Sequence, residues 1–377
     1  MTKLMVETLD TESTVVNMGP QHPSTHGVIN LRLQLKGEVI QAVDPHVGYL
    51  HRSIEKISEL TQYTGFIPYT DRVDYLAAMF GNQVWCMAVE KLLGIQVPRR
   101  AEYLRVIACE LNRIISHLIA CGTMAMDLGA FTPFLHGIRE REKVNDIMEK
   151  ICGARLNYNY MRIGGVCRDF MPGLDKEILT FLERFENFIP EFNRLITGNE
   201  IFVQRLIHIG VIPGQLAIDY GLGGPNLRAS GVDFDLRRDF PYSAYPEFKF
   251  KVVGGANSRG ETGDSFARYM ARIEEMEESA KIVRQAIQGL PAGEHQTKIL
   301  RNPVAPPGEV YSRVESARGE MGFHVISNGT DTAYRTKIRT GSFLAMAILP
   351  KIVPGMMVAD LTACFGSLDV VAPEVDR

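Results

Sequence analysis

Hydrophobic and polar residues alternate near the start of the chain, follow helical spacing through its middle and alternate again toward its end. Alternation over residues 28–35, which ends at Gly37, and over residues 39–43 predicts two strands. Helical spacing occupies residues 73–93, 98–122, 139–152, 174–206 and 265–290, with a bend or break expected at Pro190. Strand patterns at residues 309–314, 322–327 and 333–338 follow, with a turn at Asn328 and Gly329. The pattern predicts an α+β fold, in which a central helical bundle is flanked by β-rich elements.

The character of the sequence divides the chain into three parts. Residues 1–65 are predicted to form a β-containing module, residues 66–210 a helical bundle, and residues 211–377 a wrapped loop, a long helix and a β-rich end. Within the third part, residues 210–263 are rich in Gly, Pro, Arg and Tyr and show little periodicity beyond a short strand at 248–253. Such a stretch is typical of a long functional loop. The helix over 265–290 is amphipathic, with many charges opposite its apolar side.

Composition excludes several classes of protein. The net charge is −3, and no cluster of Lys and Arg is interleaved with aromatic residues, which argues against a nucleic-acid partner. The uncharged apolar stretches at 114–126 and 340–350 are shorter than the roughly 18 to 20 residues of a membrane span. No secretory signal is recognised in the first fourteen residues, so a cytosolic compartment is expected. The six cysteines include no CxxC pair and are expected to be buried, reduced thiols.

A loop with two histidines is the most informative short segment. Residues 19–27 read GPQHPSTHG and contain His22 and His26. The two prolines fix φ and lack an N–H donor, and the glycines at either end permit the backbone angles of a tight reversal. The segment is therefore predicted to form the tip of a hairpin that precedes the strand at 28–35. A histidine in such a loop is, by itself, more typical of a turn than of a site, and His22 is interpreted as structural.

Further motifs follow in order along almost the whole chain. They are PHVGYLHRSIEK at 45–56, YTDRVDYL at 69–76, MDLGAFTPF at 126–134, RERE at 139–142, LRASG at 227–231 and YRTKIR at 334–339. On these motifs the chain resembles the D subunits of proton-pumping NADH-quinone oxidoreductase, respiratory complex I, a family related to the large subunits of nickel-iron (NiFe) hydrogenases. The resemblance implies a hydrogenase-like fold in which the three parts of the chain form one intertwined unit.

The resemblance also implies a function and its residues. Quinone would be the substrate, reduced with electrons from an iron–sulfur cluster of the B subunit and coupled to proton translocation. His26 and Tyr75 would hydrogen-bond the quinone head group, and Asp127 would interact with that histidine. Imidazole, phenol and carboxyl groups suit a reaction that needs two protons. Arg52 and Arg72 would face the cluster, where positive charge stabilises the reduced form.

Each of these residues also has an ordinary structural interpretation. Tyr75 could be a core aromatic residue, and Asp127 could cap the turn that follows it. Arg52 and Arg72 could form plain salt bridges, for instance with Glu55 and Asp71. The combined motifs, rather than any single residue, favour the functional interpretation.

The resemblance implies partner subunits and leaves alternative functions open. The B and C subunits, the membrane-embedded H subunit, the I subunit and other peripheral-arm subunits are expected, on the cytoplasmic side of the cell membrane. This chain is expected to hold no metal or nucleotide, because it lacks the paired CxxC motifs of nickel hydrogenases, H-E-x-x-H, G-x-G-x-x-G and the Walker A sequence. Ferredoxin-linked or F420H2-linked quinone reductases and a non-catalytic assembly protein are the alternatives. The quinone type, the electron donor and the coupling mechanism stay open.

One position departs from the family pattern. Residues 153–157 read GARLN, and Asn157 stands where the family often has a histidine that is associated with the pH dependence of the cluster potential. Because asparagine does not titrate, this departure predicts a weaker pH dependence of that potential and is compatible with a low-potential quinone such as menaquinone.

Overall fold

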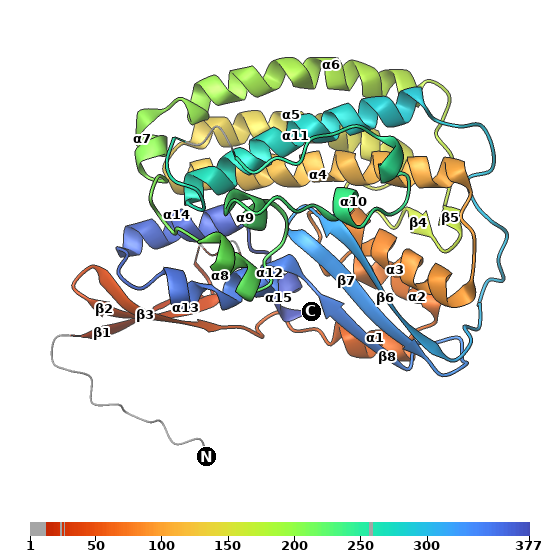
Figure 1. Ribbon diagram of the computed structural model, residues 1–377, viewed down its shortest axis with the longest axis horizontal. Helices are drawn as coiled ribbons and strands as arrows, with labels where there is room; N and C mark the ends of the chain where they lie inside the picture. The colour runs from red at the N-terminus through yellow and green to blue at the C-terminus, as the bar shows by residue number, and fades with distance from the viewer. Residues whose placement is uncertain (1–12, 23–24, 26, 256–258) are drawn as a thin grey trace.

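The computed structural model describes residues 13–22, 25, 27–255 and 259–377. Helices and strands are both present, and long helices pack beside small antiparallel sheets (Figure 1). The predicted α+β class is therefore confirmed. The division of the chain at residues 65 and 210 stays a prediction.

The N-terminal sheet carries the histidine loop. Its strands are β1 (Thr14–Met18), β2 (Asn30–Lys36) and β3 (Val39–His46), which pair antiparallel in that order. Leu31 and Leu33 point into the core because strand side chains alternate between the two faces. The outer side of β3 is held by residues 355–358, since the Ile40 N–H donates to the Met356 carbonyl at 2.8 Å. Both predicted strands are confirmed, and residues 19–29 connect β1 to β2.

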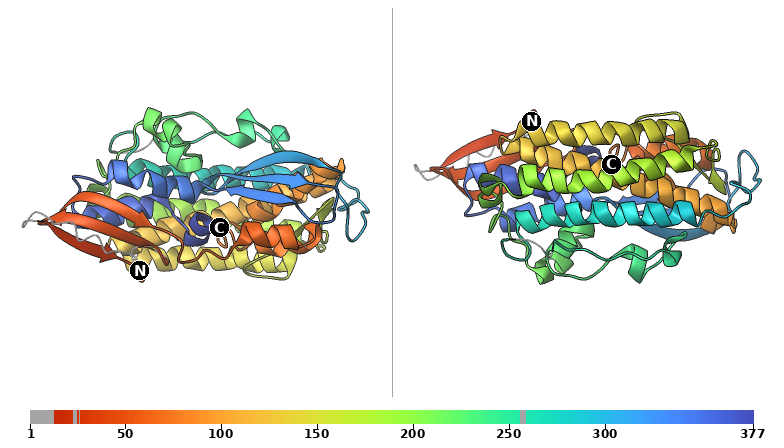
Figure 2. Two further views of the ribbon diagram at one scale, coloured as in Figure 1. Left: turned by 90° about the horizontal axis from the view of Figure 1, so that it is seen from below. Right: turned by 90° about the horizontal axis from the view of Figure 1, so that it is seen from above.

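Four long helices form the bundle seen edge-on in Figure 2. The helices before residue 210 are α1 (Ile54–Leu60), α2 (Tyr63–Thr70), α3 (Ala78–Leu93), α4 (Arg99–Asp127), α5 (Phe131–Cys152), α6 (Leu174–Phe192) and α7 (Glu200–Gln204), with a π turn at Asn193–Thr197. A two-stranded ribbon, β4 (Met161–Arg162) and β5 (Gly165–Val166), follows α5. The long helices are α4, α5, α6 and, later in the chain, α11 (Ser265–Gln288).

Two predicted boundaries in this region are wrong. The helix predicted from residue 73 begins at Ala78, because the Asp74 carboxylate accepts the N–H groups of Leu76 and Ala77 at 3.1 and 3.2 Å and turns the chain there. The helix at 174–206 passes through Pro190 and breaks only near Gly198. Phenylalanines 181, 185, 188 and 192 stack along the buried face on both sides of the proline, and this packing holds the helix together.

The segment after residue 210 wraps over the bundle. It contains the short helices α8 (Gly214–Asp219), α9 (Gly224–Ala229) and α10 (Leu236–Asp239) and a 3-10 turn at Tyr245–Glu247. The strand predicted at 248–253 is wrong. The N–H groups of Lys249 and Lys251 donate to side chains of α11, Gln285 at 2.9 Å and Glu278 at 2.8 Å, so this stretch binds a helix instead of a sheet.

Helix α11 itself has the predicted extent, and the Asp264 carboxylate caps its first turn by accepting the Ala267 N–H at 2.7 Å. The charged side of the helix is only partly exposed to solvent, at Glu277 and Lys281 for example. Arg268, Arg272 and Glu275 are buried, because the wrapped segment covers the polar side of the helix (Figure 2, left).

The C-terminal part supplies a second sheet and four short helices. Strands β6 (Gly308–Ser316), β7 (Gly319–Ser327) and β8 (Arg335–Arg339) pair antiparallel, as the sequence predicts. Helices α12 (Gly341–Ala347), α13 (Leu349–Ile352), α14 (Val358–Leu368) and α15 (Ala372–Asp376) follow. Helix α14 packs against α4 and α11, which brings the end of the chain into the centre of the molecule.

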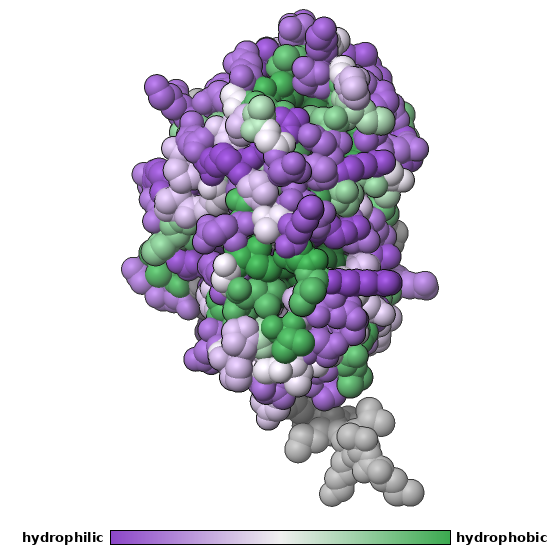
Figure 3. All heavy atoms as spheres, turned by 90° about the vertical axis from the view of Figure 1, so that its right-hand side faces the viewer, coloured by the Kyte–Doolittle hydropathy of each residue, from purple (hydrophilic) through white to green (hydrophobic). Residues whose placement is uncertain are grey.

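The cysteines and the exposed apolar side chains bear on the chemistry and on the partners of the chain. All six cysteines are free; Cys86, Cys109, Cys121 and Cys364 are buried and the other two are partly buried, which agrees with the expected reduced thiols. Apolar side chains gather between charged ones on the face shown in Figure 3. The exposed large apolar side chains include Leu60 and Leu300. Exposed apolar patches are typical of surfaces that meet other proteins.

Candidate active site

The histidine loop lies against the C-terminal helix. His26 itself lies outside the described residues. On either side of it, the Thr25 hydroxyl donates to the carbonyls of His22 and Gly27 at 2.8 and 3.0 Å, which closes the turn. A Cβ atom at Gly27 would lie 3.2 Å from the Cβ of Ala372 in α15. The loop therefore ends in direct contact with the last helix of the chain.

Tyr75 lies in the turn between α2 and α3 and is partly buried. Its neighbour Asp74 is fully enclosed and forms an ion pair of 2.7 Å with Arg318, whose guanidinium also donates to the Asp369 carboxylate at 3.2 Å. Burial raises the pKa of Tyr75, and the charges of Asp74 and Asp369 act in the same direction against that of Arg318. The phenol is thus held protonated at neutral pH, as a hydrogen-bond donor must be.

Asp127 is the last residue of α4, and its side chain is partly buried. Its Oδ2 atom lies 3.4 Å from the position that a Cβ atom would take at Gly366 in α14. The small residue at 366 allows the carboxylate to lie close against this helix.

These three places border one stretch of chain, residues 366–374. Asp127 contacts it at Gly366, Tyr75 is linked to it through Asp74, Arg318 and Asp369, and the histidine loop contacts it at Ala372. The histidine loop, Tyr75 and Asp127 thus converge on the end of the chain. They are about fifty residues apart from one another and more than two hundred residues from that end. The sequence motifs suggest such a meeting of side chains only by resemblance.

Arg52 and Arg72 lie together at an exposed surface. The Arg52 guanidinium donates to the Arg72 carbonyl at 2.7 Å. The Arg72 guanidinium donates to the Pro68 carbonyl and lies 3.4 Å from the Asp71 carboxylate. The alternative interpretation of Arg72 as a salt-bridge residue therefore holds in part. Glu55, the alternative partner of Arg52, instead forms an ion pair of 2.7 Å with Lys337. The Arg52 side chain therefore lies against the backbone of Arg72, and both arginine side chains are accessible to solvent.

Behind Arg72, Asp71 is a buried carboxyl group. It accepts a hydrogen bond of 2.7 Å from the Asn82 amide and one from the backbone N–H of Asn159. Burial raises the pKa of Asp71 to about 7, although Asn82 and Arg72 oppose the shift. Asn157, two residues before Asn159, has a left-handed backbone with φ of 56°, which asparagine tolerates well. The family-variable position thus lies on a segment that binds Asp71.

Sequence reasoning missed the charged residues behind Tyr75. Arg318, Asp369 and Glu374 belong to none of the motifs given a role, yet all three are buried. The available signal was weak: Asp369 and Glu374 are the charged residues of an otherwise uncharged, largely apolar stretch, residues 361–375, and a carboxylate in such a context needs a partner.

The described part of the chain contains neither a candidate metal centre nor a candidate membrane span. Within residues 13–22, 25, 27–255 and 259–377, no group of three or more His, Cys, Asp or Glu side chains is arranged to hold a metal ion. In the same ranges, no helix combines the length and apolar character needed to span a bilayer.

Comparison with known proteins shows the family of the chain. A family model described as respiratory-chain NADH dehydrogenase, 49 Kd subunit, matches residues 127–302 and 297–377. The chain belongs to this family. It is 59% identical to an NADH-quinone oxidoreductase D subunit, the copy numbered 2, of Anaeromyxobacter dehalogenans, with all of both chains covered. It is also 53% identical to the corresponding copy of Sorangium cellulosum over 98% of this chain and 95% of that one, and 46% identical to the D subunit of Bacillus anthracis over 97% and 99%.

Proposed function

We propose that this chain forms the quinone-binding site of a proton-translocating NADH-quinone oxidoreductase and reduces quinone with electrons from an iron–sulfur cluster of the B subunit. The observation that supports this most strongly is the convergence of the histidine loop, Tyr75 and Asp127 on residues 366–374. A quinone has two carbonyl oxygens and takes up two protons, so its site needs donors from more than one segment.

Each side chain has a role in this proposal. His26 and Tyr75 donate hydrogen bonds to the quinone head group, and Asp127 favours the charged form of the histidine. The phenol of Tyr75 supplies one proton and the imidazole supplies the other. Arg52 and Arg72 face the partner's cluster, where their charges favour the added electron.

The wider setting follows from the family. We propose that the fold is that of NiFe hydrogenase large subunits, one intertwined unit, and that the B, C and I subunits and the membrane-embedded H subunit are partners on the cytoplasmic side of the membrane. NADH is the proposed source of electrons because the relatives are named as NADH-quinone oxidoreductases. Ferredoxin-linked or F420H2-linked quinone reductases are the second candidate. In this proposal another subunit binds the electron donor, so the residues of this chain do not distinguish the donors.

Replacing Tyr75 by phenylalanine is expected to lower quinone-linked NADH oxidation at least about tenfold, because the phenyl ring keeps the packing and loses the donated proton. The measurement compares, in host membranes, NADH oxidation with quinone and with an artificial acceptor that takes electrons upstream. Tyr69→Phe is the matched control, since Tyr69 lies in the same motif and is exposed. Retention of both rates in Tyr75→Phe would refute the role of Tyr75, and loss of both would assign the residue to assembly.

The potential of the partner's cluster is expected to depend weakly on pH, and Asn157→His is expected to strengthen that dependence. The test is a redox titration of the cluster at several pH values in the whole complex. Asp71→Asn serves as the control, since burial raises the pKa of Asp71 to about 7 and its charge lies beside Arg72. If the cluster potential depends steeply on pH although residue 157 is asparagine, and still does so in Asp71→Asn, then position 157 does not control this dependence.

A further inference from the structure

Three buried carboxyl groups act on one arginine, Arg318, and two of them, Asp74 and Asp369, also act on Tyr75 through their charges. Arg318, between β6 and β7, binds Asp74 at 2.7 Å and Asp369 at 3.2 Å. Glu374 of α15 is fully enclosed and accepts hydrogen bonds from the backbone and hydroxyl of Ser342. Its other carboxyl oxygen, Oε1, has no hydrogen-bond partner among the described residues. We call Asp74, Asp369, Glu374 and Arg318 the acid cluster.

The charges of the acid cluster do not balance. Arg272 of α11 adds a second guanidinium 3.7 Å from Asp369. Arg377 is partly exposed, and its charge is shared between Glu55 at 3.9 Å and Glu374. Three carboxylates therefore face two buried cations. An uncompensated buried charge is costly, so a bound proton is the cheapest way to restore neutrality.

The pKa shifts of Glu374 and Asp74 lead to the same conclusion. Burial, followed by the charge of Asp74, raises the pKa of Glu374 to about 8, against the effect of Arg318. Burial also raises the pKa of Asp74, with Asp369 acting in the same direction. The Arg318 guanidinium stays charged, and the added proton is divided between Asp74 and Glu374.

We propose that Asp74 and Glu374 share one proton beside Arg318, and that the acid cluster returns this proton to Tyr75 after Tyr75 has protonated quinone. This inference rests on the proposed function. In balance, two electrons arrive from the partner's cluster, the phenol O–H bond breaks and a quinol O–H bond forms. The tyrosinate then takes the proton of the shared carboxyl group, which becomes a carboxylate until solvent protonates it again.

Proton affinity gives this step its direction. Burial and the nearby carboxylates raise the pKa of Tyr75 above its ordinary value near 10, whereas the pKa of Glu374 is about 8. A tyrosinate is therefore the stronger base and draws the proton from the carboxyl group. The acid cluster restores the donor without waiting for a proton from solvent, which matters more near neutral pH than at acid pH.

Glu374→Gln in the whole complex tests the proposal. It keeps the shape of the side chain and cannot supply a proton. Quinone-linked NADH oxidation is therefore expected to fall at least about tenfold at a pH of about 7.5, where the carboxyl group with its pKa of about 8 is still mostly protonated, and little at a pH of about 6, where solvent protons are more abundant. Glu374→Asp retains a carboxyl group and is expected to recover most of the rate at the higher pH. Glu278→Gln is the control, a buried glutamate of α11 that pairs with Lys281 and lies outside the acid cluster.

We call the proton shared by Asp74 and Glu374 the proton store. The outcomes for the Glu374 and Tyr75 variants distinguish a failure of the proton store from a failure of the proposed function. A Glu374→Gln pH profile that matches the wild type overturns the proton store, whatever Tyr75→Phe does. If Tyr75→Phe keeps its quinone-linked rate, the proposed function of Tyr75 fails first. If Glu374→Gln also loses the upstream rate, Asp74→Asn replaces it, because an asparagine oxygen can still accept the N–H groups of Leu76 and Ala77. A wild-type profile in Asp74→Asn likewise overturns the proton store.

Discussion

Replacing Glu275 by alanine is expected to lower the free energy of unfolding by about 3 to 5 kcal/mol. Glu275 is buried in α11 and accepts hydrogen bonds from Arg228 at 2.9 Å, Arg237 at 2.7 Å and His117 at 2.9 Å. Its removal takes one carboxylate from these buried guanidinium groups and leaves N–H donors of Arg228, Arg237 and His117 without their acceptor, which costs more than the loss of the contacts themselves. Urea denaturation of the full chain at neutral pH measures the change.

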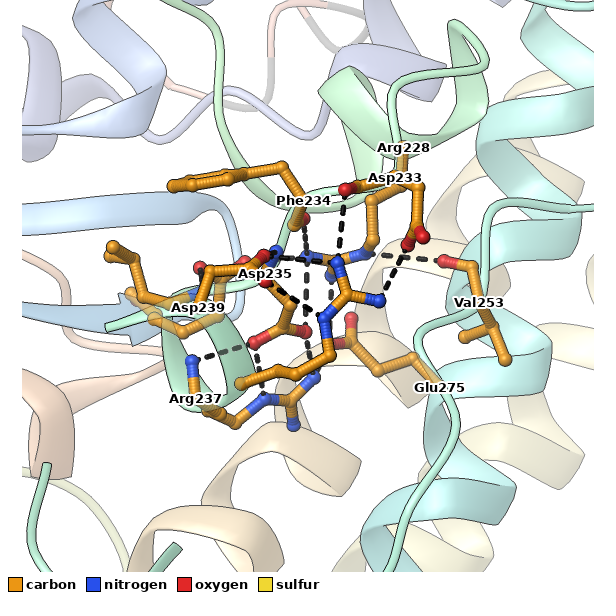
Figure 4. A network of polar contacts seen from close by, with 12 residues as sticks. Arg228, Asp233, Phe234, Asp235, Arg237, Asp239, Val253 and Glu275 are labelled. Atoms are coloured by element: carbon orange, nitrogen blue, oxygen red, sulfur yellow. Dashed lines mark hydrogen bonds and ion pairs between the residues drawn. The ribbon is translucent and has the colours of Figure 1, made fainter. Parts of the chain in front are cut away.

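The loss is expected to appear first in the wrapped segment. Arg228, Asp235 and Arg237 come from this segment, and Figure 4 shows them directed at one another and at Glu275. They are also bound to the bundle through Glu110 of α4 and to β6 through Glu315. Hydrogen exchange should therefore rise over residues 224–239 before it rises in α4.

Glu277 offers a matched control, since it lies two residues further along α11 and is exposed. Glu277→Ala is expected to change stability by no more than about 0.5 kcal/mol. Equal losses in the two variants would mean that the buried network does not hold the wrapped segment in place.

This network explains why the sequence predicts the extent of α11 but not its surroundings. The spacing of hydrophobic residues and the capping of a helix are local properties of the sequence. The ends of α11 at Asp264 and Gly289 can therefore be predicted from neighbouring residues. Charged residues at helical spacing predict a solvent face under the usual rule. Glu275 is nevertheless buried, because its partners are Arg237, 38 positions earlier in the chain, and His117 of helix α4.

The candidate site shows the same limit. The motifs indicate Tyr75, Asp127, Arg52 and Arg72, and the structure gives each a definite neighbourhood. Arg318, which links Asp74 to Asp369, lies 244 positions from the one and 51 from the other. No spacing rule connects residues so far apart, and only the close packing of α9 on the turn between β6 and β7 brings Arg318 to the site.

Replacing Gly319 by alanine is expected to destabilise the chain by roughly 2 to 6 kcal/mol. Gly319 has φ of +116°, and a Cβ atom there would lie 2.7 Å from the carbonyl carbon of Gly223. The backbone at the start of α9 must move to make room, and Arg318 is the residue immediately before the change. Thermal or urea denaturation measures the loss, and membranes that carry the variant should show a lower quinone-linked rate.

Gly329→Ala separates strain from close packing. Gly329 also has positive φ, +94°, but its nearest neighbour is the side chain of Pro307 at 3.4 Å. This variant shares the backbone strain and avoids the collision, so a loss of about 1 kcal/mol and a normal quinone-linked rate are expected. If the two variants behaved alike, the approach of Gly223 to Gly319 would not be what positions Arg318. If only Gly319→Ala impairs quinone reduction, the contact between α9 and this turn positions the arginine that holds Asp74 behind Tyr75.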